Sequence, residues 1–219
     1  KTETLAYAMA DSPMGPFTFT GIIMDESPSG CWTNHHSITE YNGQWYLFYH
    51  HNDYSPNFDK NRSARIDSLF FNTDGTIKKV KPTLRGVGIT DARSKIQIDR
   101  YSTISPYGVT IDYLEPSNTF EGWQTLFNRA GTWVTYNKVD FGTTPVKRLK
   151  ARVRSEKGGA ITLRTPGEKG MTIAELPIKP TGKWTEISTN VSNAPTSMQD
   201  LIITQTGENP VAVDWISFE

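Results

Sequence analysis

The chain has 219 residues, and its 23 lysines and arginines equal its 23 aspartates and glutamates, so the formal net charge is zero. This balance argues against nucleic acid or an anionic membrane as a partner, because both attract a surplus of basic side chains. No apolar run approaches the ~18 residues that cross a bilayer. The single cysteine, Cys31, excludes an internal disulfide or a cysteine-rich metal site.

The chain begins with a predicted pair of strands. Residues 5–10 (LAYAMA) and 18–24 (TFTGIIM) are apolar runs, and the segment between them, DSPMGPF, has the prolines and glycine of a turn. The sequence starts at Lys1 rather than methionine and shows no signal peptide. We therefore expect that the numbering begins inside a longer precursor.

All four histidines fall in the next segment, TNHHSITEYNGQWYLFYHH. We predict one strand over 35–41 and a second over 44–51, because Asn42-Gly43 tolerates the positive φ of a tight hairpin turn. Side chains alternate along a strand, so His35 and His36 would face opposite sides. Without a bulge, two adjacent histidines cannot serve one site, and a hydrogen-bonded structural histidine is the alternative for each.

A further strand is predicted over 62–72, followed by an Asp74-Gly75 turn and a short run at 77–80. Residues 82–95 contain a proline and two glycines that indicate a connector, and a second unit is expected from Ile96. From there about eight or nine runs alternate apolar and polar residues, a pattern typical of a jelly-roll β-sandwich. The whole chain is therefore predicted to be all-β.

Three segments closely resemble the last part of the catalytic domain of glycoside hydrolase family 43, in the family's order and spacing: MADSPMGPFTFTGIIM, HHSITEYNGQWYLFYHH and NRSARIDSLFFNTDGTIKKV. Members of that family are five-bladed β-propellers that cleave arabinofuranosides and xylosides. The resemblance implies that residues 1–90 form the C-terminal part of such a propeller, about one and a half blades. Its implied partner is the N-terminal remainder of the propeller, since a piece of this size exposes its sheet edges.

The same resemblance implies roles for two side chains near the propeller axis. His35 matches a histidine that helps to hold calcium, largely through bound water. Arg62 matches an arginine close to the substrate, with Arg65 as the weaker candidate. The alternatives are a structural histidine and a solvated arginine at a strand edge.

Family 43 enzymes invert the anomeric configuration, which requires a general acid and a general base roughly 6.5–9.5 Å apart. No aspartate of this chain matches the family's catalytic positions, so no catalytic residue is assigned here, and both carboxylates are expected in the preceding part of the parent. Turn or loop positions explain the available aspartates better: Asp53, Asp59, Asp67 and Asp74.

A second resemblance covers the rest of the chain, residues 91–219. The segments AGTWVTYNKVDFG, ARVRSEKGGAITLRT, PTGKW and VAVDWISF resemble a carbohydrate-binding module of family 6. Such modules hold a sugar between two aromatic rings, which implies Trp184 and, at the position of a tyrosine, Phe127; Trp123 and Tyr107 are reserves. The family's asparagine falls on Ala212, for which Asn209 is the expected substitute. A core tryptophan is the alternative for Trp184.

The family 6 resemblance also implies a structural calcium ion. Gln97 and Asp99 on the first strand and Asp214 on the last match its ligands, and amide and carboxylate oxygens suit this ion. Residues two apart on one strand face the same side, so Gln97 and Asp99 are predicted to act together.

The combined resemblances imply part of a secreted or periplasmic glycosidase with an appended carbohydrate-binding module. The parent would be an inverting α-L-arabinofuranosidase or β-xylosidase that binds oligo- or polysaccharides containing arabinose and xylose, as in xylan. Two alternatives stay open: a non-catalytic carbohydrate-binding protein, and an exo-galactanase-type glycosidase, because one fold hosts several specificities.

Overall fold

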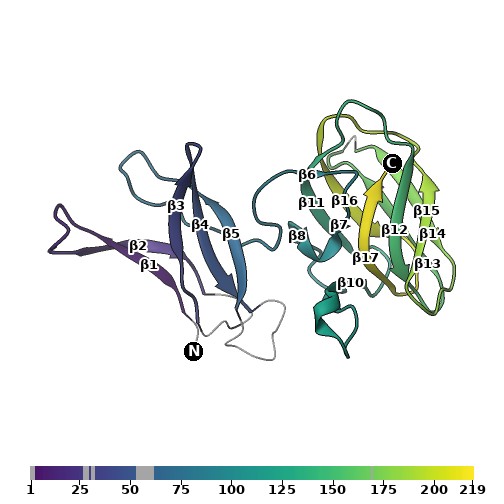
Figure 1. The fold of residues 1–219 in the computed structure, drawn as a ribbon, viewed down its shortest axis with the longest axis horizontal. Helices are drawn as coiled ribbons and strands as arrows, with labels where there is room; N and C mark the ends of the chain where they lie inside the picture. The colour runs from purple at the N-terminus through teal and green to yellow at the C-terminus, as the bar shows by residue number, and fades with distance from the viewer. Residues whose placement is uncertain (1–2, 27–29, 31–32, 53–61, 169) are drawn as a thin grey trace. The chain divides into compact units, whose positions relative to one another are not determined.

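The computed structural model describes residues 3–26, 30, 33–52, 62–168 and 170–219, so Cys31, Asp53 and Asp59 lie outside the described residues. The chain divides into two compact units, Lys1–Val87 and Gly88–Glu219. Strands make up both units, and the helical pieces of the described chain are two 3-10 turns, η1 (Ile98–Arg100) and η2 (Thr119–Glu121) (Figure 1). The predicted all-β class is confirmed. The described residues include no helix with the length and apolarity needed to cross a lipid bilayer.

The first unit contains two small antiparallel sheets. One pairs β1 (Leu5–Met9) with β2 (Thr18–Met24), and the other has the order β3 (Ser37–Tyr41), β4 (Gln44–His51), β5 (Ser63–Leu69) (Figure 1). Both residues of the predicted hairpin turn have positive φ, 50° at Asn42 and 76° at Gly43, which confirms the turn.

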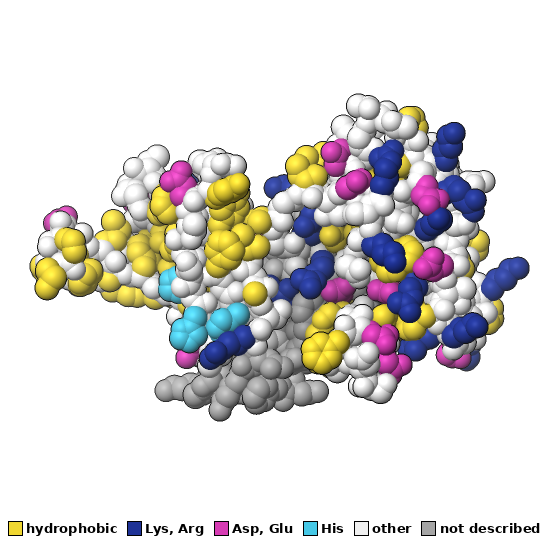
Figure 2. Space-filling view, viewed as in Figure 1, with side chains coloured by type: hydrophobic (Ala, Val, Ile, Leu, Met, Phe, Trp, Pro, Cys, Tyr) yellow, Lys and Arg dark blue, Asp and Glu magenta, His cyan; other side chains and the backbone are white. Residues whose placement is uncertain are grey.

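The first unit buries little apolar surface and exposes much. Among the described residues of this unit, the core contains seven buried side chains: Leu5, Ile23, Met24, Leu47, Tyr49, Leu69 and Val80. On β4 the alternation sends Leu47 inward and Phe48 outward. Phe19 of β2 is 69% exposed, and Phe17, just before this strand, is 63% exposed. Figure 2 shows these strands carrying hydrophobic side chains on their surface.

One buried carboxylate ties the first unit together. Asp67 accepts hydrogen bonds from the Tyr49 hydroxyl at 2.5 Å and from the backbone N–H and hydroxyl of Thr83 at 3.0 and 2.7 Å. Burial, followed by the charge of Asp67, raises the pKa of the Tyr49 hydroxyl well above its usual range. Asp67 is therefore a structural residue, but it lies within β5, so the prediction that it occupies a turn or loop is wrong.

The second unit is a β-sandwich of two six-stranded sheets. The first sheet has the order β15 (Thr185–Asn190), β12 (Arg148–Arg154), β17 (Val211–Phe218), β10 (Trp123–Phe127), β9 (Val109–Tyr113), and β7 (Ile96–Gln97) also pairs with β17. The second has the order β14 (Thr172–Ile178), β13 (Gly159–Arg164), β16 (Met198–Gln205), β11 (Trp133–Asp140), β6 (Thr90–Asp91), and β8 (Thr103–Ile104) pairs with β11. The predicted sandwich is confirmed.

Apolar side chains from both sheets fill the space between them. Phe127, Leu149 and Phe218 come from the first sheet, and Leu163 and Ile203 from the second, all completely buried. On β12 the period-two pattern sends Leu149, Ala151 and Val153 inward, so the arginines and the lysine between them point to the outer side. This outer side of the first sheet carries the candidate site.

The second unit begins earlier than the sequence predicts. Thr90 and Asp91 pair with Val139 and Asp140 in the second sheet, and Ala92 is completely buried. The predicted connector over 82–95 therefore belongs in part to the sandwich, because a short parallel strand pairing has no local sequence signature.

Candidate functional site

Strand β12 carries a row of cations on the outer side of the first sheet. Three of them bind groups on a neighbouring strand or just after one. Arg148 donates to the Ser188 hydroxyl, Lys150 pairs with Glu219 at 2.5 Å, and Arg152 Nη1 lies 2.7 Å from Asp214 Oδ2. The fourth cation, Arg154, ends the strand opposite Ala212 of β17, a residue with no acceptor in its side chain.

A β-bulge places two consecutive residues of β17 on this outer side. Arg152 pairs with Trp215 and the next residue, Val153, pairs with Val213, so Asp214 is the extra residue. Val213 faces the core, and Trp215 lies under the Lys95 ammonium, 4.5 Å from the ring centroid. Burial raises the pKa of the Asp214 carboxyl, although the Arg152 hydrogen bond and charge act in the opposite direction.

Trp184 precedes β15 and lies beside the same cations. The guanidinium carbons of Arg152 and Arg154 are 5.4 and 5.2 Å from its ring centroid, within range of cation–π attraction. The indole Nε1 is buried and has no hydrogen-bond partner among the described residues. Trp184 is not part of the buried core cluster, so the structure does not support the core alternative.

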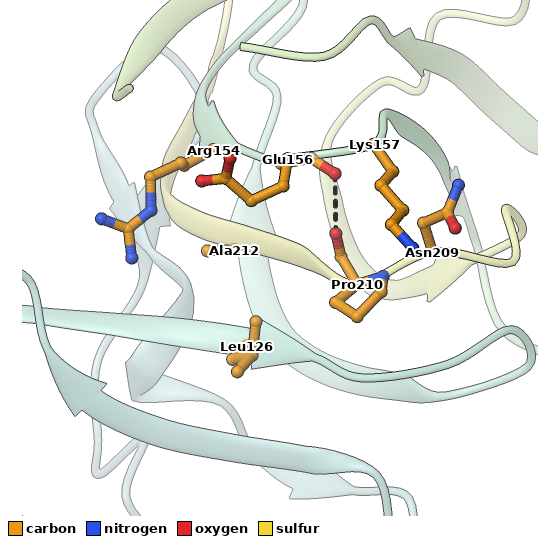
Figure 3. A pocket seen from close by; sticks show the side chains of 8 residues that line it. Leu126, Arg154, Glu156, Lys157, Asn209, Pro210 and Ala212 are labelled. Carbon is orange, nitrogen blue, oxygen red and sulfur yellow. Dashed lines mark hydrogen bonds between the residues drawn. The ribbon is translucent and has the colours of Figure 1, made fainter. Parts of the chain in front are cut away.

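A hollow of about 360 Å³, which we call the Arg154 cleft, opens next to this arginine (Figure 3). Leu126 of β10 and Ala212 of β17 supply apolar surface, and the loop Ser155–Lys157 meets Asn209 and Pro210 at the other end. The Ser155 hydroxyl donates to the Pro210 carbonyl at 2.7 Å and so joins the two loops. Figure 3 shows Arg154 and Lys157 on different sides of the cleft, with Ala212 between them in this view.

A cleft of this composition on the outside of a β-sandwich fits the comparison with known proteins. The family model for the carbohydrate-binding module of family 6 matches residues 105–219, more than half of the chain. This chain belongs to carbohydrate-binding module family 6. The predicted resemblance of its second unit is thereby confirmed.

Relatives of this chain are named for the hydrolysis of arabinoxylan and xylosides. An arabinoxylan arabinofuranohydrolase of Paenibacillus polymyxa is 28% identical over 93% of this chain and 34% of its own length. A β-xylosidase of Xylanibacter ruminicola is 46% identical over 36% of this chain and 24% of its own length. Both resemblances drawn from the sequence are therefore confirmed.

The solved structures agree with the sequence relatives. A glycoside hydrolase family 43 arabinoxylan arabinofuranohydrolase from Bacillus subtilis, in complex with cellotetraose, matches 97% of this chain and 47% of that protein with 25% identity and a TM-score of 0.61. This chain thus spans about a quarter to a half of the length of these three relatives.

The structure does not bring the predicted sugar-binding residues of the family 6 module together at one site. Phe127 is completely buried in the core, so its prediction as a stacking residue is wrong: Leu126 points outward, and its neighbour on the strand must point inward. Asn209 does line the Arg154 cleft, as does Ala212. Trp184 lies beyond Arg154, whose guanidinium contacts its ring.

Sequence reasoning missed Arg154, Leu126 and Lys157, which contribute to the cleft. The alternation in KARVRSEK contains a signal for Arg154, because a cation at the last outward position of a strand reaches the loop end of the sheet. Nothing local in the sequence shows that β10 and β17 bring Leu126 opposite Ala212.

The two reserve aromatics lie elsewhere in the module. Trp123 stacks on Tyr113 with ring centroids 4.3 Å apart. Tyr107 is 66% exposed, lies 4.1 Å from the Arg129 guanidinium and lines a separate hollow of about 320 Å³ with Trp133. Neither ring lines the Arg154 cleft, so neither replaces Phe127 there.

The three predicted calcium ligands of the module come from neighbouring segments. Gln97 pairs with Trp215, next to Asp214, whereas Asp99 lies in η1, so the argument that Gln97 and Asp99 alternate on one strand is wrong. Both aspartates are buried, but each has an oxygen close to an arginine: Asp99 to Arg100 Nε at 3.2 Å, and Asp214 to Arg152. Two buried carboxylates suit calcium chemically, and a bound ion would compete with these arginines. The described residues contain no group of three or more His, Cys, Asp or Glu side chains arranged for a metal.

The predicted residues of the first unit lie around His50. The backbone N–H of His35 donates to His50 Nε2 at 3.1 Å, and the two rings are 5.7 Å apart. Burial lowers the pKa of His50, and the charges of Arg62, His35 and His51 act in the same direction. The side chains of His35 and Arg62 are exposed, and both lie near the His50 imidazole. Arg65, in contrast, is only 5% exposed.

The histidine pair does not have the strand geometry that the sequence predicts. Strand β3 begins at Ser37, so His35 and His36 precede it, and the expectation that they face opposite sides of a sheet does not apply. Both side chains are exposed.

Proposed function

We propose that residues 88–219 bind a plant cell-wall polysaccharide through the Arg154 cleft. The observation that supports this function is the composition of the cleft: apolar surface from Leu126 and Ala212 lies beside the polar ends of Arg154, Lys157 and Asn209. A sugar has C–H faces that pack on apolar surface and hydroxyls that need hydrogen-bonding groups. Arabinose- and xylose-containing glycans are the proposed ligands, because the relatives are named for arabinoxylan and xyloside hydrolysis.

We propose that residues 1–87 complete the propeller of an inverting glycosidase that hydrolyses arabinofuranosyl or xylosyl linkages. The exposed Phe17 and Phe19 support a covering partner, which is the N-terminal remainder of the propeller. The general acid and base belong to that remainder, and His35 and Arg62 assist from this side. His35 would contribute to a largely hydrated calcium ion.

A second calcium ion is proposed in the module, held by Gln97, Asp99 and Asp214. The burial of both carboxylates supports it, because a bound cation compensates buried negative charge. We also propose that the parent acts outside the cytoplasm, in the periplasm or secreted, because its polymeric substrate is found there.

Isothermal titration with xylo-, arabinoxylo- and cello-oligosaccharides tests the binding function. We expect measurable heat with at least one xylose-based ligand, and Asn209→Ala should weaken that binding about fivefold through the loss of a hydrogen bond. Tyr107→Ala, in the separate hollow, is the matched control and should bind as the original chain does. Absence of heat with all three ligands would contradict the proposal.

A further inference from the structure

Arg154 differs from the other outward cations of β12 in lacking a partner for its charge. Arg148, Lys150 and Arg152 bind Ser188, Glu219 and Asp214. Among the residues that the structure describes, no carboxylate lies within ion-pair distance of Arg154. The strand β12 thus keeps one guanidinium available at the edge of the cleft.

The acidic side chains around Arg154 do not neutralise it. The Glu115 carboxylate is engaged by Ser117, whose backbone N–H and hydroxyl donate to it at 3.1 and 2.8 Å. These hydrogen bonds lower the pKa of Glu115 more than the charge of Arg154 does. Glu156 lines the cleft but is exposed to water, which screens its charge. With Arg154 and Lys157 positive and Glu156 negative, the formal charge of the lining is +1.

The guanidinium of Arg154 is held in position rather than free in solvent. Its carbon lies 5.2 Å from the centroid of Trp184, and the side chain is half-buried. Cation–π contact restricts the long side chain, so less conformational entropy is lost when the planar fork binds an anion. A carboxylate matches that fork, because two parallel N–H groups reach its two oxygens.

Apolar surface next to this fork suits an anion that is attached to a larger molecule. Leu126 and Ala212 lie beside Arg154 and offer no hydrogen bond to a small ion, but they suit the C–H face of a pyranose ring. Asn209 and Lys157, at the other end, can bind hydroxyls of the same or the next sugar.

We propose that the Arg154 cleft selects acidic glycans: it binds a hexuronic acid residue of the polysaccharide, with the carboxylate on Arg154 and the ring over Leu126 and Ala212. This inference rests on the proposed glycan-binding function and adds the class of sugar. Arg154 is the specificity residue, and Trp184 is a positioning residue that holds the guanidinium.

The test compares three ligands by isothermal titration on the purified chain: a xylo-oligosaccharide with one glucuronic acid branch, the same compound with its carboxyl reduced to an alcohol, and the unbranched oligosaccharide. We expect the acidic ligand to bind about tenfold tighter than its reduced form, because a hydrogen-bonded charge pair is lost. Added salt should reduce the difference.

Two variants assign the preference to Arg154. Arg154→Gln should lower the affinity for the acidic ligand to that for the reduced ligand, so that the difference between the two ligands disappears. Arg148→Gln, the same substitution at the other end of β12, is the matched control and should keep the full difference. If Arg154→Gln fails to fold, Arg154→Lys retains the charge without the planar fork and should lose most of the preference.

Three results would contradict different parts of this proposal. Equal affinities for acidic and reduced ligands in the unchanged chain would overturn the acidic preference and leave glycan binding intact. No heat with any ligand would overturn glycan binding as well. A preference that survives in Arg154→Gln and Arg154→Lys would place the carboxylate elsewhere.

Discussion

The two units of this chain bury their apolar residues in different ways. The second encloses phenylalanines such as Phe127 and Phe218 between two sheets, whereas the first leaves Phe17 and Phe19 on its surface. Both follow the same alternation along their strands, so the difference is in what covers the second face of each sheet. A sandwich supplies its own cover, whereas the first unit leaves Phe17 and Phe19 uncovered among the residues that the structure describes.

The two units also differ in how their charged side chains are paired. In the first unit the buried Asp67 is fully engaged by Tyr49 and Thr83. In the second, the outer cations are paired along β12 until Arg154, whose charge faces a cleft. The first unit therefore uses its buried charge for structure, and the second leaves a half-buried cation at the edge of a cleft.

The largest expected difference between the two units is the loss of stability when one phenylalanine of each unit is replaced by alanine. Phe127→Ala should destabilise the second unit by about 3–5 kcal/mol, because it opens a cavity between the sheets. Phe19→Ala should change the stability of the isolated chain by no more than about 0.5 kcal/mol, because the side chain is exposed. Denaturant titration measures both, and equal losses would contradict the contrast between the units.

Calcium should stabilise the second unit if the proposed site exists. At a free calcium concentration one hundred times its Kd, the expected gain is about 2.7 kcal/mol. Asp214→Asn should abolish this gain, and Asp112→Asn, an exposed aspartate on the same sheet, should preserve it. Thermal melts with calcium or with a chelator provide the measurement, and identical melting temperatures would rule out the site.

Loss of a hydrogen bond to the buried carboxylate of the first unit, Asp67, should reduce stability by a smaller amount. Tyr49→Phe removes a hydrogen bond to charged Asp67 and should cost about 2 kcal/mol. Asp25→Asn, which loses only the exposed pair with Lys79, should cost under about 1 kcal/mol. Limited proteolysis at sites in residues 1–87 distinguishes the two variants. Equal cleavage rates would contradict a structural role for the hydrogen bonds of Asp67.

The smallest expected effect is a dependence on pH near His50. Burial and nearby charges lower its pKa in the folded chain, so the unfolded chain binds the proton more readily. The stability of the first unit should therefore fall as the pH drops through about 6.5, the unperturbed histidine value. His50→Gln should flatten this slope in urea unfolding at pH 5.5 to 7.5, and a slope of opposite sign would contradict the assignment.

Local sequence rules predicted much of this fold. Asn42-Gly43 predicted the hairpin, because few residues accept its positive φ, and the alternating runs after Ile96 predicted the β-sandwich. Short segments of the sequence predicted the resemblance to glycoside hydrolase family 43 and to carbohydrate-binding module family 6. The family model, the relatives and the solved structures confirm both resemblances.

Only the tertiary structure decided the details of the site. The bulge at Asp214 shifts the alternation of β17 by one residue, and η1 removes Asp99 from its predicted strand. The pairing of β10 with β17 sets Leu126 beside Ala212 and sends Phe127 into the core. Sequence specifies the period of a strand, but register and bulges depend on the strands beside it. For that reason Arg154, an ordinary strand residue in the sequence, becomes a cation at the edge of the cleft with no carboxylate in ion-pair distance among the described residues.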